Sequence, residues 1–290
     1  MPPRRSAQLR APKRGTEFRR HHDRLALYHG ATQHEEYWRS YWTPAARATL
    51  MERGRLGDLD EFEEIFARYL PRNLPILEAG CGPAHFVAAL RARGYDAFGV
   101  DFEPEVVRWV KETIPDLDVR LGDVRSLDIP TGSLGGYISL GVVEHFEGGP
   151  EEALREARRV LHPEGVAFVS TPFLNPLRAR QLSAPLRKGE EPGTHEFHQY
   201  YFSEDQLASA LTDAGFHVVD RLPYAVEAFL IREHPVFSRF WRSRFTRESI
   251  KRFFRRRMPF APAAIRNRYA HMLLLVARPI ASERGRPPGA

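Results

Sequence analysis

The sequence has a single cysteine, Cys81, and no apolar stretch of membrane-spanning length. One cysteine excludes an intrachain disulfide framework and favours a reducing compartment. The aliphatic run from Met272 to Ala277 is far shorter than the roughly 20 residues that a spanning helix needs. There is no apolar signal-peptide core, and the prolines near the start oppose the amphipathic helix of a transit peptide. We therefore expect a cytoplasmic, globular protein.

The net charge of +6 is unevenly distributed. Residues 1–20 contribute +6 and residues 231–257 contribute +8, and subtracting both from the total leaves −8 on the remainder. Basicity confined to two segments argues against a protein that binds nucleic acid over its whole surface. It favours local contact with something anionic.

From residue 75 onward, short apolar segments alternate with amphipathic helical patterns. The predicted strands are 76–79, 97–100, 118–121, 136–141, 166–170, 216–219 and 272–277, and the predicted helices are 85–93, 104–113, 150–161 and one that begins after Ser203. Such alternation predicts an α/β fold with an open, seven-stranded, mostly parallel sheet between two layers of helices.

The domain organisation follows from composition. We expect a disordered basic tail over 1–20, a helical lid over 21–56, the main domain over 57–280 and a disordered tail over 281–290. Two excursions longer than a normal connection interrupt the domain, a substrate lid over 172–202 and a basic helical insertion over 223–270. The aromatic residues of the N-terminal lid, Tyr37 and Trp38 among them, either pack its helix onto the body or cover a ligand pocket.

The stretch 76–101 indicates a nucleotide-type site. It predicts a strand, a turn with Gly80 and Gly82, a helix, and a second strand that ends at Asp101. The glycines allow backbone N–H groups to approach a ligand, and an acidic residue about 20 positions further on suits ribose hydroxyls. Glu78, at the mouth of the first strand, would repel a pyrophosphate and attract a cationic amino-acid group.

Further motifs follow the later strands, and together they carry a resemblance to a known family. They are Gly122-Asp123-Val124, Val143-Glu144-His145-Phe146, Leu161-His162-Pro163-Glu164-Gly165, and Phe202-Ser203 with Ala214-Gly215-Phe216. The set resembles class I S-adenosylmethionine-dependent methyltransferases, in the small-molecule subgroup that includes the quinone-biosynthesis methylases. The resemblance covers residues 60–222 and 271–278, and it implies a three-layer, Rossmann-like methyltransferase fold whose last two strands form an antiparallel edge.

The resemblance also implies the cofactor, S-adenosyl-L-methionine, and its contacts. These contacts are Glu78, Gly80, Cys81, Gly82, Asp101, Phe102, Asp123, Val124 and Gly141. Within the set, Asp101 would hold the ribose diol, and Asp123 with Val124 would hold the adenine.

Three departures from related patterns narrow the chemistry. Ala84 stands where the glycine loop usually has its third glycine, and it is small enough to keep binding. Gly141 stands where the quinone-type O-methylases carry a further acid of a metal site, so we predict no metal. Ser139-Leu140-Gly141-Val142 replaces the Asn/Asp-Pro-Pro-aromatic motif of many methylases that act on nucleobase amines.

Two histidines are candidates for a general base. A base is needed only when the acceptor carries a proton, as a hydroxyl does, and histidine suits neutral pH. His145 follows the fourth strand, and His198 lies where the first excursion returns to the sheet. Each could instead be a hydrogen-bonded loop residue. The candidates for acceptor contacts are Tyr37, Trp38, Glu144, His195, Tyr200 and Tyr201.

Residues 237–258 read as two short amphipathic helices, with aromatic residues on one face and arginines beside them. They could cap the pocket, contact an anionic membrane surface, or contact RNA. A peripheral membrane position is one of these alternatives, and nucleic acid is the less favoured partner.

These observations favour methyl transfer from S-adenosylmethionine to a small-molecule or lipid-like acceptor, with O-methylation ahead of other targets. One alternative is an RNA methyltransferase that uses the basic insertion. Another is a nicotinamide-dependent oxidoreductase, which Glu78 and the missing third glycine oppose. A third is a cofactor-binding protein without catalysis.

Overall fold

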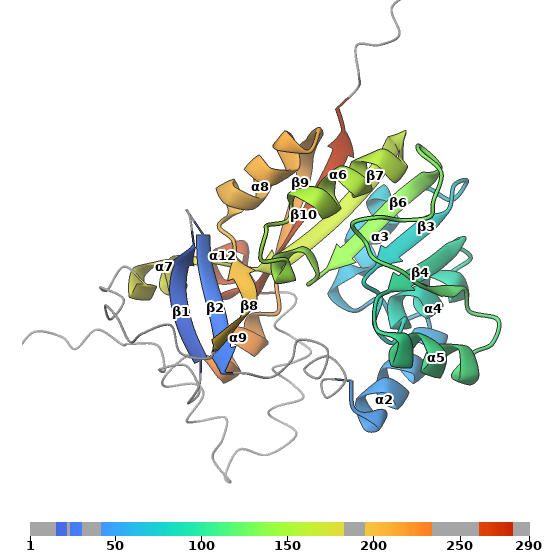
Figure 1. Cartoon of the computed structure of the whole chain (residues 1–290), viewed down its shortest axis with the longest axis horizontal. Coiled ribbons are helices and arrows are strands. Elements are labelled where there is room, and N and C mark those ends of the chain that lie inside the picture. The colour runs from blue at the N-terminus through green and yellow to red at the C-terminus, as the bar shows by residue number, and fades with distance from the viewer. Residues whose placement is uncertain (1–15, 22–23, 31–41, 183–194, 234–260, 281–290) are drawn as a thin grey trace, which may run out of the picture.

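The computed structural model describes residues 16–21, 24–30, 42–182, 195–233 and 261–280 of the 290-residue chain. Its main element is a seven-stranded sheet with the order β5-β4-β3-β6-β7-β10-β9 (Figure 1). The strands are β3 (Ile76–Ala79), β4 (Ala97–Asp101), β5 (Val119–Leu121), β6 (Leu134–Leu140), β7 (Leu161–Pro172), β9 (Phe216–Tyr224) and β10 (Met272–Pro279). The predicted seven-stranded α/β fold is therefore confirmed.

The strand directions explain where a ligand can bind. Strands β3 to β7 pair in parallel, whereas β10 runs antiparallel to both of its neighbours, β7 and β9. The reversed strand is thus second from the edge, and β9 forms the edge itself. Because the order reverses between β3 and β6, the loops after these two strands diverge and leave a crevice at their carboxyl ends.

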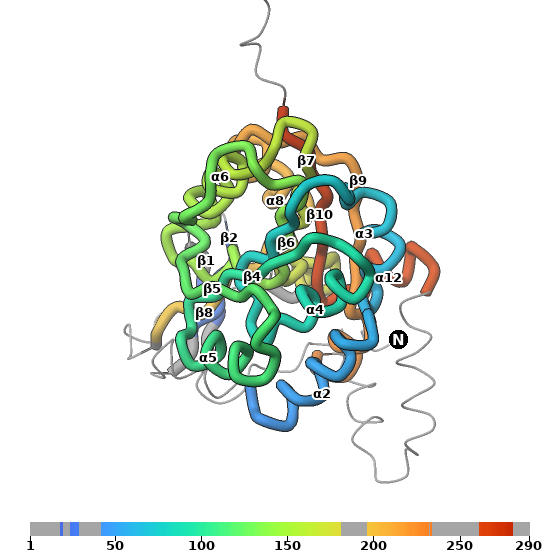
Figure 2. The backbone as a smooth tube through the Cα atoms, turned by 90° about the vertical axis from the view of Figure 1, so that its right-hand side faces the viewer, coloured from blue at the N-terminus to red at the C-terminus, as the bar shows by residue number. Residues whose placement is uncertain are grey.

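Helices cover both faces of the sheet (Figure 2). One face carries α3 (Glu63–Tyr69), α4 (His85–Ala92) and α5 (Pro104–Thr113), with α2 (Pro44–Arg55) packed outside α4. The other face carries α6 (Glu151–Val160) and α8 (Glu204–Asp213). Short 3₁₀ turns, η1 (Asp60–Phe62) and η2 (Val143–His145), precede α3 and follow β6.

The ends of these helices follow local chemistry. Pro104 occupies the first turn of α5, where its missing N–H costs nothing, and the Glu103 carboxylate accepts the N–H of Glu105. Ser203 and Gln206 form a capping box at the start of α8.

A second, three-stranded sheet lies beside the main one. It consists of β1 (Thr16–His21), β2 (Arg24–Gly30) and β8 (His195–Tyr201), all antiparallel, in the order β1-β2-β8 (Figure 1). This corrects the expectation of a disordered tail through residue 20 and of a helical segment from residue 21. The segment forms strands because its apolar residues Leu25 and Leu27 pair with and pack against a strand 170 residues away.

Three short helices belong to the predicted excursions. They are α7 (Pro176–Leu182), α9 (Val226–Arg232) and α12 (Ala263–Tyr269). The first excursion contains α7 and β8, so part of the predicted lid is a strand. Strand β9 extends to Tyr224, beyond its predicted end at residue 219. The second excursion, predicted from residue 223, therefore begins where this strand ends. Residues 237–258, with their predicted amphipathic helices, lie outside the described residues. None of the helices within the described ranges has the length and apolarity that crossing a membrane requires.

Candidate active site

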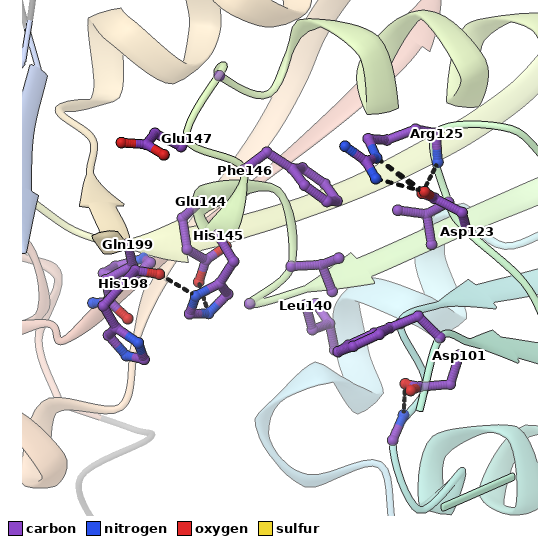
Figure 3. A pocket seen from close by; sticks show the side chains of 18 of the residues that line it. Asp101, Asp123, Arg125, Leu140, Glu144, His145, Phe146, Glu147, His198 and Gln199 are labelled. Atoms are coloured by element: carbon purple, nitrogen blue, oxygen red, sulfur yellow. Dashed lines mark hydrogen bonds and ion pairs between the residues drawn. The ribbon is translucent and has the colours of Figure 1, made fainter. Parts of the chain in front are cut away.

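A cavity of about 1160 Å³ opens at the carboxyl ends of β3, β4 and β6 (Figure 3). Its walls come from the loops after these strands and after β5, from the first half of α6, from α9 and the start of β10, and from η2 and β8. The sequence-predicted residues that line it are Gly80, Gly82, Asp101, Phe102, Asp123, Val124, Gly141, Glu144, His145 and His198. Residues from distant positions in the chain thus meet at one site.

The glycine turn lets backbone approach the cavity closely. Gly80 and Gly82 have φ angles of +76° and +49°, which side chains rarely adopt. A Cβ on Gly80 would lie 2.5 Å from a methyl group of Val142, and one on Gly82 would lie 2.9 Å from the Trp42 ring. Both positions therefore require glycine, and Trp42 covers the turn from the N-terminal side.

Asp101 connects the glycine turn to the second strand. One carboxylate oxygen accepts the Gly82 N–H at 2.7 Å, and the other accepts the Glu103 N–H at 2.9 Å. The side chain is only 6% exposed, and burial raises the pKa of this carboxyl against the opposing effect of the two hydrogen bonds. Phe102, which follows it, is 45% exposed at the cavity wall.

Glu78 does not lie where the sequence placed it. It is 5% exposed, and its carboxyl accepts the Val87 N–H of α4 at 3.1 Å beneath the turn. It is absent from the cavity wall, because this position in a fully buried strand points toward the helix layer. Burial raises the pKa of Glu78 well above its usual range. Its role is to hold the first turn of α4 in place.

Cys81 is also turned away from the cavity wall. Its side chain is 3% exposed, and a Cβ on Gly99 would lie only 2.6 Å from its sulfur. Burial raises the pKa of the thiol well above its usual range, so Cys81 is a packed residue and a poor nucleophile. Only its backbone can contribute to a ligand site.

Ala84 has the backbone conformation of the glycine that it replaces. It lies in the left-handed region, with φ 58° and ψ 31°, immediately before α4. We expect Ala84→Gly to raise the free energy of unfolding by about 0.5–1 kcal/mol, because glycine adopts this conformation without steric cost. Urea unfolding checks this. The matched variant Ala88→Gly, inside the same helix, should instead lower stability by about 1 kcal/mol; a loss in both variants would contradict the expectation.

Asp123 lies at the adenine end predicted for the cavity, but it already has a partner. The Arg125 side chain donates two parallel hydrogen bonds to it, at 3.0 and 2.7 Å, and these lower the pKa of Asp123 (Figure 3). The guanidinium lies 4.9 Å from the centre of the Phe146 ring. Arg125 and Phe146 therefore form part of this wall together with Val124.

Glu144 is a carboxyl group sealed inside the protein. It is 1% exposed, and its Oε2 atom has no hydrogen-bond partner among the described residues. Burial raises its pKa to about 8, so the carboxyl is uncharged at neutral pH. Gly141, with φ +73°, makes the turn that brings this side chain to the cavity.

His145 has a fixed orientation. Its Nδ1 lies 2.7 Å from the backbone oxygen of His198, and because a carbonyl only accepts, Nδ1 carries the proton (Figure 3). The lone pair is then on Nε2, which lies 3.8 Å from Oε1 of Glu144. The two histidine rings pack edge to face at 5.1 Å. His145 is thus held in the tautomer that a general base needs.

The raised pKa of Glu144 predicts a pH dependence of stability. Its folded pKa of about 8 lies above the ordinary value of 4.5 for a glutamate. The protonated group is therefore favoured by folding, and stability is lost as pH rises between these values. We expect Glu144 to contribute a few kcal/mol to this loss, so the stability of Glu144→Gln should fall by that much less between about pH 5 and pH 8 in urea unfolding. Glu147→Gln serves as the control, and equal pH dependence in both variants would contradict the assignment.

The other residues predicted to contact the acceptor do not meet at the cavity where the structure describes their side chains. Tyr200 donates its hydroxyl to the Glu147 backbone oxygen at 2.7 Å, and Tyr201 packs with Leu25 and Leu27; neither lines the cavity. His195 begins β8, and its side chain lies outside the description. Tyr37 and Trp38 lie outside the described residues, so their predicted contacts remain untested.

Sequence reasoning missed several residues of the cavity wall. They include Trp42, Arg125, Phe146, Glu151, Glu152, Arg155, Gln199, Ala225, Ala228, His271 and Met272. Trp42 belongs to the same aromatic group as Tyr37 and Trp38, for which the sequence predicts either packing onto the body or a lid. His271 precedes a strand antiparallel to β7, so strand direction alone would have placed it near the ligand end. The others depend on tertiary packing.

Comparison with known proteins finds similarity to S-adenosylmethionine-dependent methyltransferases. Residues 77–169 match a family model described as a methyltransferase domain. A protein of Mycolicibacterium smegmatis, named as a probable S-adenosylmethionine-dependent methyltransferase, is 30% identical over 147 residues, which is 51% of this chain and 53% of the relative. A Mycobacterium tuberculosis protein with a similar name is 29% identical over 154 residues, which is 52% of this chain and 53% of that relative. The chain spans about half the length of these relatives.

Solved structures show the same fold at low sequence identity. A chain from the complex between a Haloferax volcanii methyltransferase and the Trm112 methyltransferase activator has a TM-score of 0.55 at 17% identity, covering 87% of this chain and 99% of that one. A Methanosarcina mazei structure titled as a SAM-dependent methyltransferase has a TM-score of 0.51 at 18% identity, covering 75% and 98%. The narrower resemblance to quinone-biosynthesis methylases stays a prediction.

Proposed function

We propose that this protein transfers a methyl group from S-adenosyl-L-methionine to a hydroxyl of a small-molecule or lipid-like acceptor. The observation that carries the proposal is one cavity that joins the Gly80–Gly82 turn and Asp101 to a histidine fixed for proton abstraction. The named relatives and the methyltransferase-domain match support the class of reaction.

The residues of the turn fit this cofactor. Any side chain at Gly80 or Gly82 would collide with the present walls, so backbone lies directly at the cavity. Asp101 presents a carboxylate beside the exposed Phe102 ring, which suits a ribose diol next to an adenine. Asp123 and Val124 would border the adenine. When bound, the cofactor supplies an electrophilic methyl group on a sulfonium.

His145 would accept the proton of the acceptor hydroxyl. As the acceptor oxygen forms its bond to the methyl carbon and the carbon–sulfur bond breaks, the hydroxyl proton would pass to Nε2 of His145. The imidazolium that results lies beside the Glu144 carboxyl. The backbone oxygen of His198 keeps the ring in place throughout.

A methyl-transfer assay tests the proposal. Purified protein and tritiated S-adenosylmethionine are incubated with panels of uncharged phenols and alcohols, of matched amines, and of unmodified RNA. We expect label in the hydroxyl panel. Label only in the amines would overturn O-methylation, and label only in RNA would support the RNA alternative. The cytoplasmic location and a membrane contact through residues 237–258 remain predictions.

A further inference from the structure

Helices α7 and α12 enclose a small pocket outside the cavity. The pocket measures about 180 Å³, and its lining residues are Pro176, Leu177, Arg180, Ala264, Asn267 and Arg268. The described residues that line it thus offer two guanidinium groups and one amide, and none of them is acidic. Such a set of hydrogen-bond donors suits a phosphate group. We call this pocket, together with the neighbouring Ile265, the α7–α12 face.

The two arginines of this face are exposed and unpaired. Residues 176–182 and 261–280 contain five arginines and neither aspartate nor glutamate. Arg180 and Arg268 have no carboxylate partner among the described residues, and both side chains are exposed. Because their charge is not balanced locally, they attract an anionic partner.

Two carboxylates near the face already have cationic partners. Glu233 pairs with Arg178, which is 2% exposed and belongs to the interior of the protein. Glu204 pairs with Arg221, whose other N–H group donates to the Asn267 side chain at 3.3 Å. Neither carboxylate therefore neutralises the exposed arginines of the pocket.

Helix α12 also exposes apolar side chains. None of its residues from Ala263 to Tyr269 is buried, and Ile265 is 40% exposed. Ile265 and Arg268 are three residues apart, so they share one side of the helix. An apolar side chain next to cations is the arrangement of a surface segment that enters the headgroup layer of a membrane.

The face has a fixed position relative to the cavity. The Asn175 side chain, just before α7, donates to the Ala270 backbone oxygen at the end of α12 and accepts the Arg178 N–H, both at 2.9 Å. Helix α12 then leads directly into His271 and Met272, which line the cavity. A surface that holds the α7–α12 face would therefore also hold this wall of the cavity near it.

The character of the face favours a lipid surface over RNA. Single-stranded RNA is bound by aromatic side chains that stack on its bases. The aromatic residue of α12, Tyr269, packs instead against Phe229, with 6.2 Å between the ring centres. Residues 231–257, which contribute +8, come shortly before α12 in the chain and add charge of the sign that an anionic membrane attracts.

We propose that the α7–α12 face docks this protein on an anionic phospholipid bilayer. Arg180 and Arg268 bind headgroup phosphates, and Ile265 enters the boundary between headgroups and acyl chains. This inference goes beyond the proposed function and does not depend on methyl transfer. Docking in this orientation would bring the cavity wall at His271 and Met272 to the bilayer, where a lipid-like acceptor is held.

Vesicle co-sedimentation of the full chain tests the docking. Protein is mixed, at about 150 mM NaCl, with vesicles of phosphatidylcholine alone or with about 30% phosphatidylglycerol. We expect the partition coefficient to be at least tenfold higher on the anionic vesicles. Equal binding to both vesicles, or no binding to the anionic ones, would overturn the proposal. Binding of a single-stranded RNA in fluorescence anisotropy by protein that ignores anionic vesicles would overturn it in favour of nucleic acid.

A charge-reversal variant locates the docking face. Arg180→Glu combined with Arg268→Glu should lower partition onto anionic vesicles at least tenfold. The control combines Arg108→Glu and Lys111→Glu on the exposed side of α5, which changes the net charge equally and should stay within threefold of the wild type. If the folded double variant binds as tightly as this control, the docking surface lies elsewhere in the chain.

A second pair of variants tests the apolar contact. Ile265→Ser should lower partition at least threefold, because less apolar surface enters the bilayer. Leu56→Ser is the matched control, since Leu56 is 79% exposed at the end of α2, and it should bind as the wild type does. Equal partition of the two variants would contradict insertion of Ile265, and this pair decides if the charge-reversal variant fails to fold.

The docking and the proposed function fail separately. Vesicle binding is measured without cofactor or acceptor, so a protein that transfers no methyl group can still show the docking. Absence of vesicle binding in protein that methylates a soluble hydroxyl compound would remove the docking alone. Circular dichroism during thermal unfolding shows which variants are folded.

Discussion

Asp101→Ala is expected to weaken binding of S-adenosylmethionine at least about 100-fold. A ribose diol would lose two charge-assisted hydrogen bonds, each worth roughly 1.5–3 kcal/mol, and about 3 kcal/mol corresponds to a factor of 100. The substitution also releases the Gly82 and Glu103 N–H groups, which the carboxylate holds at 2.7 and 2.9 Å. Calorimetric titration with S-adenosylhomocysteine measures the effect.

Two variants show whether this loss is specific. Asp116→Ala removes an exposed carboxylate from the turn before β5 and should leave affinity unchanged. Asp101→Asn keeps one acceptor oxygen and should fall between Asp101→Ala and the wild type. If Asp101→Ala is folded and binds as tightly as the wild type, Asp101 is not the ribose contact.

His145→Ala is expected to lower kcat for transfer to a hydroxyl by a factor of 10² to 10⁴, the usual contribution of a positioned general base. This prediction rests on the tautomer of His145. Its Nδ1 donates to the His198 backbone oxygen, so only Nε2 can take the proton. The ring lies outside the glycine turn, so affinity for S-adenosylhomocysteine should stay within about twofold. Steady-state kinetics with the best hydroxyl acceptor measures the change.

The control for this loss is His162→Ala. His162 lies at the start of β7, at the end of the strand away from the cavity. There its ring accepts the Glu164 N–H in a turn. It should keep full activity. An unchanged kcat in His145→Ala would mean that the acceptor reacts without a base or that another residue supplies it.

Much of the fold could be predicted because its signals are local. Strand β3 and helix α5 have the predicted bounds. A short apolar run that ends at the glycine turn marks β3, and Pro104 marks the start of α5. Motifs after successive parallel strands meet at one edge of the sheet, which is why Asp101, Asp123 and His145 could be placed together without coordinates.

Predictions failed where the structure depends on distant pairing. Residues 24–30 pair with the neighbouring strand β1 and also with the distant strand β8, and nothing near them in sequence indicates the second contact. The side chain of Glu78 was placed at the cavity although its strand is buried on both faces, so alternation gives no sign of direction.

The cavity wall at β10 shows the same limit. Arg178, Glu233 and His271 are separated by 55 and 38 residues, and none belongs to a motif. Their network exists only once α7, α9 and β10 are packed together. Residues of the two excursions, Pro172, Ala225 and Ala228 among them, thus line the cavity together with Gly80, Gly82 and Asp101 of the stretch 76–101.

The most direct measurement is calorimetric titration of the wild-type protein with S-adenosylhomocysteine and, separately, with NAD. We predict one molecule of S-adenosylhomocysteine bound per chain and no heat of binding from NAD. The reason is that Ala84 stands where a dinucleotide-binding turn has its third glycine. Binding of NAD in its place, or no binding of S-adenosylhomocysteine by folded protein, would contradict the account.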